Sequence, residues 1–122
     1  DYTPVAVAPQ KIKKKEENWQ VALKKTPDIL KSLGQKKTDK QVLAGFALET
    51  TNERQNALAK LQQKNADIIV LNSLRDSGAG FGKDTNKIVV FDRNGGEKHF
   101  DLKSKAAVAK DIVDYIIEYI HA

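Results

Sequence analysis

The sequence lacks cysteine and methionine, has few prolines and aromatic residues, and contains no long hydrophobic run. Without cysteine the chain can form no disulfide, no thiolate metal site and no cysteine nucleophile, which suits a reducing compartment and favours a cytoplasmic protein. No apolar stretch approaches the roughly 20 residues of a membrane-spanning helix. Residues 1–10 also lack the charged start and apolar core of a signal peptide. We therefore expect no membrane segment.

What is present is a globular composition in a short chain. The chain has 122 residues, of which 40% are hydrophobic and 30% charged, so it makes one domain at most. At this length roughly two-thirds of the surface of the unfolded chain can be buried, which allows a single ordinary core. Because the chain begins at Asp1 and contains no methionine, we expect a fragment or a processed piece.

Positive charge is concentrated in the first third of the chain. Residues 1–40 contain ten lysines and five acidic residues, whereas residues 41–122 contain eleven basic and eleven acidic residues. The densest part is the lysine run within residues 11–15. Two interpretations stay open: a solvated edge strand that lysine protects from pairing, or a pocket for a phosphate or carboxylate. A nucleic-acid surface would interleave aromatic residues with the basic ones, and only Trp19 lies near this run.

The first third is expected to form a short pair of strands and a helix. Alternating apolar residues over 19–23 predict a strand with one buried face, paired with residues 11–13 across a mobile turn. Thr26, Pro27 and Asp28 predict a helix start, with Thr26 as the cap. Gly34 is expected to end that helix.

The remainder predicts an α/β fold. Residues 41–48 and 67–71 are apolar runs typical of parallel strands buried on both faces, and a helix over 51–64 joins them in a right-handed βαβ unit. A hairpin over 87–102, with its turn at Arg93–Gly96, precedes a closing helix that Ser104 caps and that runs to about Ile120. The sum is a Rossmann-like three-layer parallel sheet, present in part, with a carboxy-terminal β-hairpin and closing helix. Such sheets bind ligands beyond the carboxyl ends of their strands.

Candidate catalytic residues are scarce. His99 and His121 come without a serine and aspartate arrangement, so both are interpreted as surface residues. The acidic residues show no metal-binding spacing, so no resident metal is expected. A divalent ion such as Mg²⁺ could still arrive on nucleotide phosphates.

Two further features have alternative interpretations. The glycine-rich stretch 77–82 resembles a phosphate loop but leads into a strand instead of a helix, which favours a flexible surface loop, with a gating role left open. Lys60 and Lys64 lie four apart on one helix face and would usually face water. They would be phosphate ligands only if that helix lies near the ligand-binding edge of the sheet.

Several segments, taken in order, resemble one family. These are DYTP, KIKK, TPDIL, GFALET, KLQQKN, GAGF and the DTN that precedes a strand. They are similar to the carboxy-terminal half of phosphopantothenoylcysteine synthetase, the ligase of coenzyme A synthesis, which is often fused to a flavin-dependent decarboxylase in bacteria. The resemblance spans Asp1 to about Ala109 and implies that residues 1–122 are the carboxy-terminal part of a synthetase domain. Since the half with its own nucleotide loop would be missing, the resemblance also implies that this piece is catalytically incomplete.

The resemblance implies a reaction in two steps. The carboxylate of 4′-phosphopantothenate attacks the α-phosphate of CTP, giving an acyl-cytidylate and pyrophosphate, and the amine of cysteine then displaces CMP. The implied requirements are CTP as substrate, Mg²⁺, and FMN only if a decarboxylase domain is present elsewhere in the full protein. The implied assembly is a homodimer, without nucleic acid or membrane as a partner. The choice between CTP and ATP stays open.

The resemblance also implies roles for individual residues. Lys11 is the implied catalytic residue, bridging the triphosphate and the acyl carboxylate. The implied nucleotide-binding residues are Asp1, Lys11, Pro27, Asp28, Ile29, Leu30, Phe46, Lys60 and Lys64. The implied flap over the acyl intermediate comprises Lys14, Lys15, Glu16, Glu17 and Asn18. The sequence departs from the family at Lys15, where a small hydroxyl residue is usual, at Ser73, where aspartate is common, and in a flap that looks short.

One other class of function competes with the ligase. A non-catalytic module could hold nucleic acid or another polyanion through the cluster Lys11–Lys15. Such binding should weaken steeply with salt and tolerate many sequences, whereas a ligase pocket should prefer one base. In a third, purely structural interpretation, the lysines only solubilise the protein.

Overall fold

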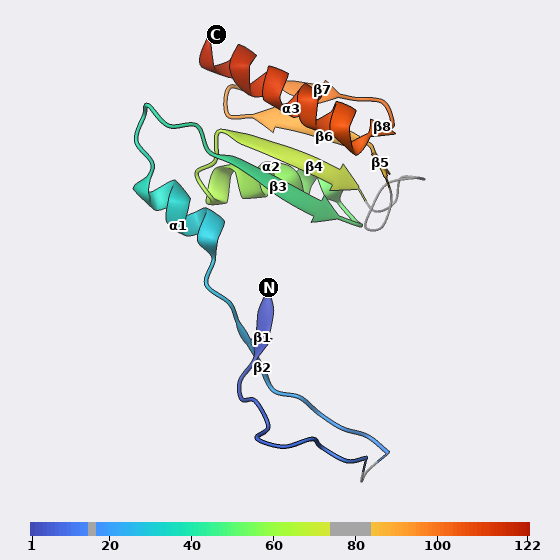
Figure 1. The fold of residues 1–122 in the computed structure, drawn as a ribbon. Helices are drawn as coiled ribbons and strands as arrows, with labels where there is room; N and C mark the ends of the chain where they lie inside the picture. The colour runs from blue at the N-terminus through green and yellow to red at the C-terminus, as the bar shows by residue number, and fades with distance from the viewer. Residues whose placement is uncertain (15–16, 74–83) are drawn as a thin grey trace.

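A computed structural model describes residues 1–14, 17–73 and 84–122. Four strands form the central sheet, in the order β3 (Ala44–Glu49), β4 (Ile68–Ser73), β6 (Ile88–Asp92) and β7 (Glu97–His99). β3 and β4 are parallel, and the other two pairings are antiparallel. Helix α2 (Glu53–Gln63) covers one face of the sheet and helix α3 (Lys105–Ile120) covers the other (Figure 1). The expected α/β class, with a parallel strand pair and a closing helix, is confirmed.

The core lies in two layers, one on each side of β4. Because side chains alternate along a strand, Ile69 and Leu71 pack with α2 while Ile68 and Val70 pack toward α3. β4 is therefore buried on both faces, as its apolar run predicted.

The prediction that residues 41–48 form a strand buried on both faces is wrong for β3. Ala47 is fully buried, but Phe46 is 67% exposed and Leu48 is 38% exposed. The reason is position, because β3 is the edge strand of the described sheet: its face toward α2 is covered, whereas on the other face Ala44 packs against the core and Phe46 and Leu48 stay exposed.

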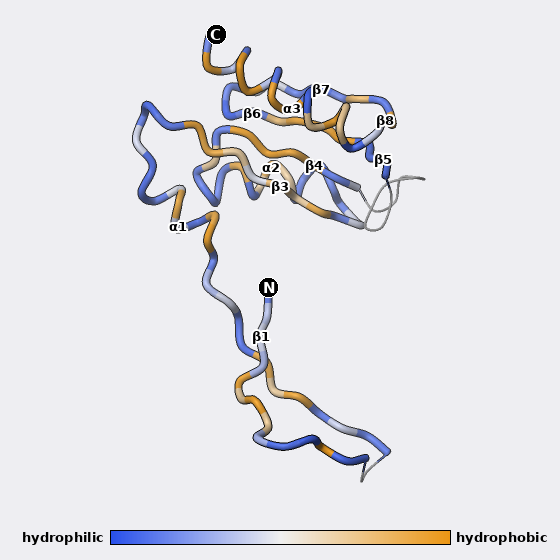
Figure 2. The backbone as a smooth tube through the Cα atoms, in the orientation of Figure 1, coloured by the Kyte–Doolittle hydropathy of each residue, from blue (hydrophilic) through white to orange (hydrophobic). Residues whose placement is uncertain are grey.

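An extended two-stranded ribbon projects away from the sheet (Figure 1). It consists of β1 (Tyr2–Pro4) paired antiparallel with β2 (Leu23–Lys25), so the predicted strand over 19–23 and its partner at 11–13 are wrong. The alternation at Trp19, Val21 and Leu23 buries no face, since all three are more than half exposed. The orange hydrophobic stretches of the ribbon lie apart from the sheet in Figure 2, so period-two alternation here has no surface to pack against.

Helix α1 (Ile29–Lys36) starts and ends later than predicted. The Asp28 carboxylate accepts a hydrogen bond from the Lys31 backbone N–H at 3.0 Å, so Asp28, not Thr26, is the N-cap. The Thr26 N–H instead donates to the Asp1 carbonyl oxygen at 3.0 Å, which extends the ribbon. The helix passes through the buried Gly34, which therefore does not end it.

The carboxy-terminal elements follow the sequence closely. Gly95, at a φ of 89°, forms the expected tight turn between β6 and β7. Ser104 caps α3 as predicted, its hydroxyl accepting from the Ala107 N–H at 3.2 Å. Two short strands, β5 (Thr85–Asn86) and β8 (Lys103–Ser104), pair beside the start of α3. The glycine-rich stretch 77–82 lies outside the described residues.

Within the described ranges, none of the helices combines the length and the hydropathy that crossing a bilayer requires.

Candidate functional site

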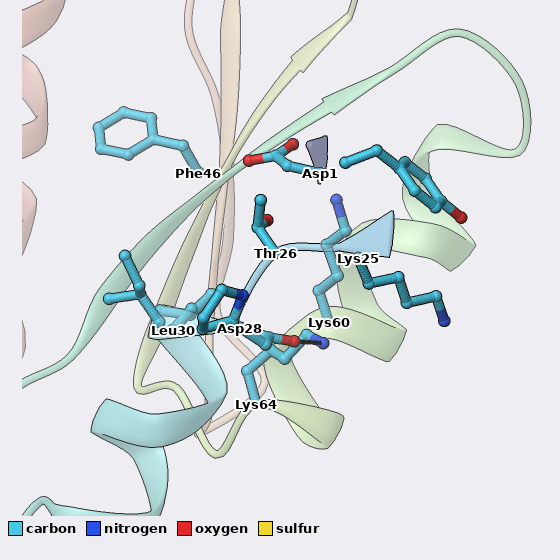
Figure 3. Close-up of a pocket in the computed structure, with 11 residues that line it drawn as sticks. Asp1, Lys25, Thr26, Asp28, Leu30, Phe46, Lys60 and Lys64 are labelled. Atoms are coloured by element: carbon cyan, nitrogen blue, oxygen red, sulfur yellow. Dashed lines mark hydrogen bonds and ion pairs between the residues drawn. The ribbon is translucent and has the colours of Figure 1, made fainter. Parts of the chain in front are cut away.

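A pocket of about 510 Å³ lies where the ribbon, the start of α1, strand β3 and helix α2 meet (Figure 3). Four consecutive residues at the start of α1, Pro27–Leu30, line it. Asp1 lines it from the ribbon, Phe46 from β3, and Lys60 and the C-cap residue Lys64 from α2. The structure thus brings together eight of the nine residues that the resemblance implied for nucleotide binding.

The ninth residue, Lys11, lies elsewhere. It is exposed on the segment that joins β1 to β2 and does not line this pocket. Lys14, Glu17 and Asn18 are exposed on the same segment. The two other predicted flap residues, Lys15 and Glu16, lie outside the described residues. The roles of Lys11 and of the flap stay predictions.

Three pocket residues were missed by the sequence analysis. Tyr2, Lys25 and Thr26 also line the pocket. They reach it because Tyr2 pairs with Lys25 across the ribbon and Thr26 bonds to Asp1. Strand pairing between distant segments leaves no periodic signal. The available signals were that Tyr2 lies in the DYTP segment, that Thr26 begins the TPDIL segment and that Lys25 directly precedes it.

Both lysines of α2 form ion pairs with carboxylates of other elements. Lys64 donates to Asp28 at 2.6 Å, which ties α2 to the N-cap of α1. Lys60 lies 3.1 Å from Glu49 at the end of β3. The predicted four-residue spacing on one helix face is confirmed, and the α2 face lies against the pocket (Figure 3). Each lysine is therefore held in place while part of its side chain stays exposed.

The electrostatic environment of Asp28 follows from these contacts. The hydrogen bond from Lys64 lowers the pKa of the Asp28 carboxyl below its ordinary value of 3.8, and the bond from the Lys31 N–H lowers it further. A carboxyl with a lowered pKa in the folded state contributes stability that is present above about pH 4 and is lost as the pH falls through the folded pKa.

Replacing Asp28 with asparagine should therefore reduce stability at pH 7, and the difference should shrink as the pH falls through the folded-state pKa of Asp28. Asparagine keeps a good N-cap but loses the ion pair with Lys64. The measurement is the free energy of urea unfolding from pH 2 to pH 7 for both proteins. The two curves should converge toward low pH, and a constant offset at all pH values would contradict a role for the Asp28 charge.

The arrangement suits an anionic ligand with a flat ring. Lysine ammonium groups and a helix start offer hydrogen-bond donors to phosphate oxygens, and the exposed Phe46 ring offers an apolar face. No cluster of three or more histidines, aspartates and glutamates with metal-binding geometry occurs in residues 1–14, 17–73 and 84–122.

The two histidines lie on the surface. His99, on β7, bonds to Glu97 at 2.9 Å and is exposed. Arg54 and then His99 lower the pKa of Glu97 through their hydrogen bonds. His121 follows the last turn of α3 and is exposed. Neither histidine lines the pocket.

Fold and pocket together define an α/β domain with a lysine-bearing pocket at the edge of its sheet. The chain belongs to the family described as DFP, the DNA/pantothenate metabolism flavoprotein C-terminal domain, which matches residues 1–120.

Named relatives carry two kinds of activity. The chain is 46% identical over 121 residues to a "Cysteine/Cysteine sulfinic acid decarboxylase" from an unknown prokaryotic organism, covering 99% of this chain and 34% of that protein. It is 42% identical over 116 residues to the "Coenzyme A biosynthesis bifunctional protein CoaBC" of Bacillus subtilis, covering 95% of this chain and 28% of that protein. The chain thus spans about a third or less of the length of these relatives.

A solved structure is also similar to this chain. The crystal structure of the C-terminal domain of a coenzyme A biosynthesis bifunctional protein CoaBC matches with a TM-score of 0.74 and 35% identity, over 99% of this chain and 50% of that one. The chain is therefore a homologue of the carboxy-terminal part of coenzyme A biosynthesis enzymes.

Proposed function

We propose that this chain forms one wall of the nucleotide site of a CTP-dependent phosphopantothenate–cysteine ligase. The observation that carries the proposal is the pocket itself. It gathers Asp1, the start of α1, Phe46 and the two lysines of α2 from four separate segments. A chance resemblance of short motifs would not be expected to place these residues around one space.

The chemistry requires anions to be held close together. The carboxylate of 4′-phosphopantothenate attacks the α-phosphate of CTP, the bond to the β-phosphate breaks, and pyrophosphate leaves. The amine of cysteine then attacks the acyl carbon and CMP leaves. Reactions of this type depend on positioning and on cations that stabilise developing negative charge.

Each wall of the pocket has a part in the proposal. Lys60 and Lys64 bind the triphosphate from α2, and the backbone at Pro27–Leu30 contacts the base. Phe46 packs beside the base or ribose. Mg²⁺ would enter on the phosphates, since the described residues offer no cluster of ligands for it. FMN has no part in this reaction.

The ribbon is proposed to supply Lys11, the flap and the homodimer contact. Tyr2, Val5, Val7, Trp19 and Val21 are all more than half exposed. A run of exposed apolar side chains on a projecting ribbon is typical of a surface that another chain covers. Closure of the flap would keep water from the acyl-cytidylate.

Replacing Lys60 or Lys64 with alanine should weaken CTP binding about tenfold each, the loss expected for one charge-assisted hydrogen bond. The measurement is a titration with CTP and with ATP of a chimera in which residues 1–122 replace the matching part of the Bacillus subtilis relative, because this chain supplies only one wall of the site. Lys110→Ala is the matched control, because Lys110 also pairs with a carboxylate but lies on α3, away from the pocket. Equal affinity for CTP in all four proteins would contradict the proposal.

A second measurement tests the ligase reaction and its two competitors. Residues 1–122 replace the matching part of the Bacillus subtilis relative, and release of pyrophosphate and of carbon dioxide is followed with 4′-phosphopantothenate, CTP and cysteine. Cysteine-dependent turnover that needs CTP supports the ligase, whereas carbon dioxide released from cysteine without CTP supports the decarboxylase named for the other relative. Binding of oligonucleotides with a steep salt dependence, and no preference for CTP, would support the polyanion module instead.

A further inference from the structure

Glu49, the last residue of β3, does not line the pocket but contacts Lys60, which does. One of its carboxylate oxygens lies 3.1 Å from the Lys60 ammonium nitrogen, and the other accepts from the Asn56 side-chain amide at 3.3 Å. The Glu49 side chain is 15% exposed, against 39% for Lys60. Lys60 lines the pocket and Glu49 does not.

Helix α2 presents its contacts on a single face. Asn56, Lys60 and Lys64 follow one another at intervals of four residues, which places them on successive turns of that face. The Asn56 amide also donates to the Thr51 carbonyl oxygen at 3.0 Å, so Asn56 is tied to the loop between β3 and α2. Glu49 is thereby held on one side by Asn56 while it holds Lys60 on the other.

A lysine ammonium has three donors on a flexible stem of four carbons, and fixing that stem costs rotamer entropy. An ion pair to a mostly buried carboxylate fixes the stem before a ligand arrives. One donor then points to Glu49, which leaves two for the oxygens of a ligand. The pair also holds the ammonium group at one place along the pocket wall.

We infer that Glu49 is a positioning residue that holds the Lys60 ammonium for the phosphate groups of a nucleotide. The inference rests on the proposed function of the pocket. It assigns the Lys60–Glu49 pair a different task from the Lys64–Asp28 pair, because Asp28 lines the pocket and would itself face the bound nucleotide.

The inference predicts whether CTP binding weakens or tightens when the Glu49 carboxylate is neutralised. A carboxylate that merely lies near an anionic ligand repels it, so neutralising that carboxylate should tighten binding. Neutralising a positioning carboxylate should weaken binding, because Lys60 loses its fixed place. We expect Glu49→Gln to weaken CTP binding about tenfold.

The experiment compares CTP affinities, measured by titration of the chimera in which residues 1–122 replace the matching part of the Bacillus subtilis relative, with thermal unfolding recorded for every variant. Glu49→Asp keeps the charge one methylene further back and should restore part of the affinity. Asp114→Asn makes the same change of charge on α3, where Asp114 pairs with Lys110, and should leave CTP affinity unchanged. In a Lys60→Ala background, Glu49→Gln should cause no further loss.

The outcomes separate the inference from the proposed function. If the chimera that carries wild-type residues 1–122 does not bind CTP, the proposed function fails and the inference fails with it. If Lys60→Ala weakens binding but Glu49→Gln leaves it unchanged or tightens it, the proposed function stands and the inference is overturned. An equal loss from Glu49→Gln with and without Lys60 would also overturn it, since the effect would not pass through Lys60. Should Glu49→Gln fail to fold, Glu49→Asp carries the same comparison in both backgrounds.

Discussion

Replacing Asp67 with alanine is expected to lower the free energy of unfolding by about 3–5 kcal/mol, the range found when one partner of a buried ion pair is removed. Asp67 is 5% exposed, and its carboxylate accepts from the Leu43 N–H at 2.8 Å and from the Tyr119 hydroxyl at 3.2 Å. The ammonium group of Lys37, whose side chain is only 9% exposed, lies 3.5 Å away. Alanine would leave this buried cation and the Leu43 N–H without their acceptor.

The size of the effect follows from where the partners come from. Lys37 follows α1, Leu43 precedes β3, and Tyr119 lies in the last turn of α3. The guanidinium group of Arg93 also lies 3.9 Å from the Asp67 carboxylate, which adds the β6–β7 turn. One carboxylate therefore connects elements from both faces of the sheet. A loss of this size is a large part of the 5–15 kcal/mol that usually separates folded from unfolded protein.

Urea unfolding of residues 1–122 at pH 7 measures the loss. Asp67→Asn should cost less than alanine, because an amide oxygen can still accept from Leu43. Asp114→Ala is the control, since it breaks an exposed pair with Lys110 and should change stability by less than about 1 kcal/mol. If Asp67→Ala were no more destabilising than Asp114→Ala, the carboxylate would not hold these elements together.

The sequence predicted best the features that depend on neighbouring residues. The tight turn at Gly95 needs a positive φ that glycine adopts freely, and the cap at Ser104 needs a hydroxyl beside a helix start. The two buried layers around β4 followed from an apolar run too short for a helix. Each of these signals lies within a few residues of the structure it specifies.

Features that depend on distant pairing were missed. The alternation over 19–23 predicted a half-buried strand, but β2 pairs with residues near the start of the chain and buries neither face. Asp67 was read only as the first residue of a strand, because nothing local marks its contact with Lys37 thirty residues earlier. The sequence predicted Thr26 as the cap of α1, but the Thr26 N–H bonds to Asp1 on the distant β1 side of the ribbon, and Asp28 caps the helix instead.

In the candidate site, too, the sequence predicted features of neighbouring residues and missed contacts between distant segments. Spacing alone indicated that Lys60 and Lys64 share a face but left them as probable surface lysines, and only the family resemblance indicated phosphate. The structure adds contacts that neither the residue spacing nor the family resemblance indicated. These are the ion pairs of the two lysines with Glu49 and Asp28, and the contribution of Lys25 to the pocket wall. These depend on how β3, α1 and the ribbon pack against α2.

The packing of α1 against the end of α2 depends on a glycine in the interior of α1. Gly34 lies inside α1, where glycine costs about 1 kcal/mol relative to alanine, so propensity alone predicts that Gly34→Ala stabilises the protein. The structure predicts the opposite. Gly34 is buried against the end of α2, and its carbonyl oxygen accepts from the Asn65 side chain at 2.8 Å. An added Cβ would overlap the Lys64 carbonyl oxygen and lie 2.9 Å from the Lys64 carbonyl carbon.

We therefore expect Gly34→Ala to destabilise the protein by about 2 kcal/mol or more, since relief of an overlap with backbone requires the two helices to move apart. The same movement should weaken CTP binding, because the N-cap of α1 and Lys64 meet at 2.6 Å in the pocket wall. Urea unfolding and CTP titration measure the two effects. Gln35→Ala, at the next and exposed position of α1, is the control and should change neither by much. A stabilised Gly34→Ala protein with unchanged CTP affinity would show that close contact between α1 and α2 is not needed to shape the pocket.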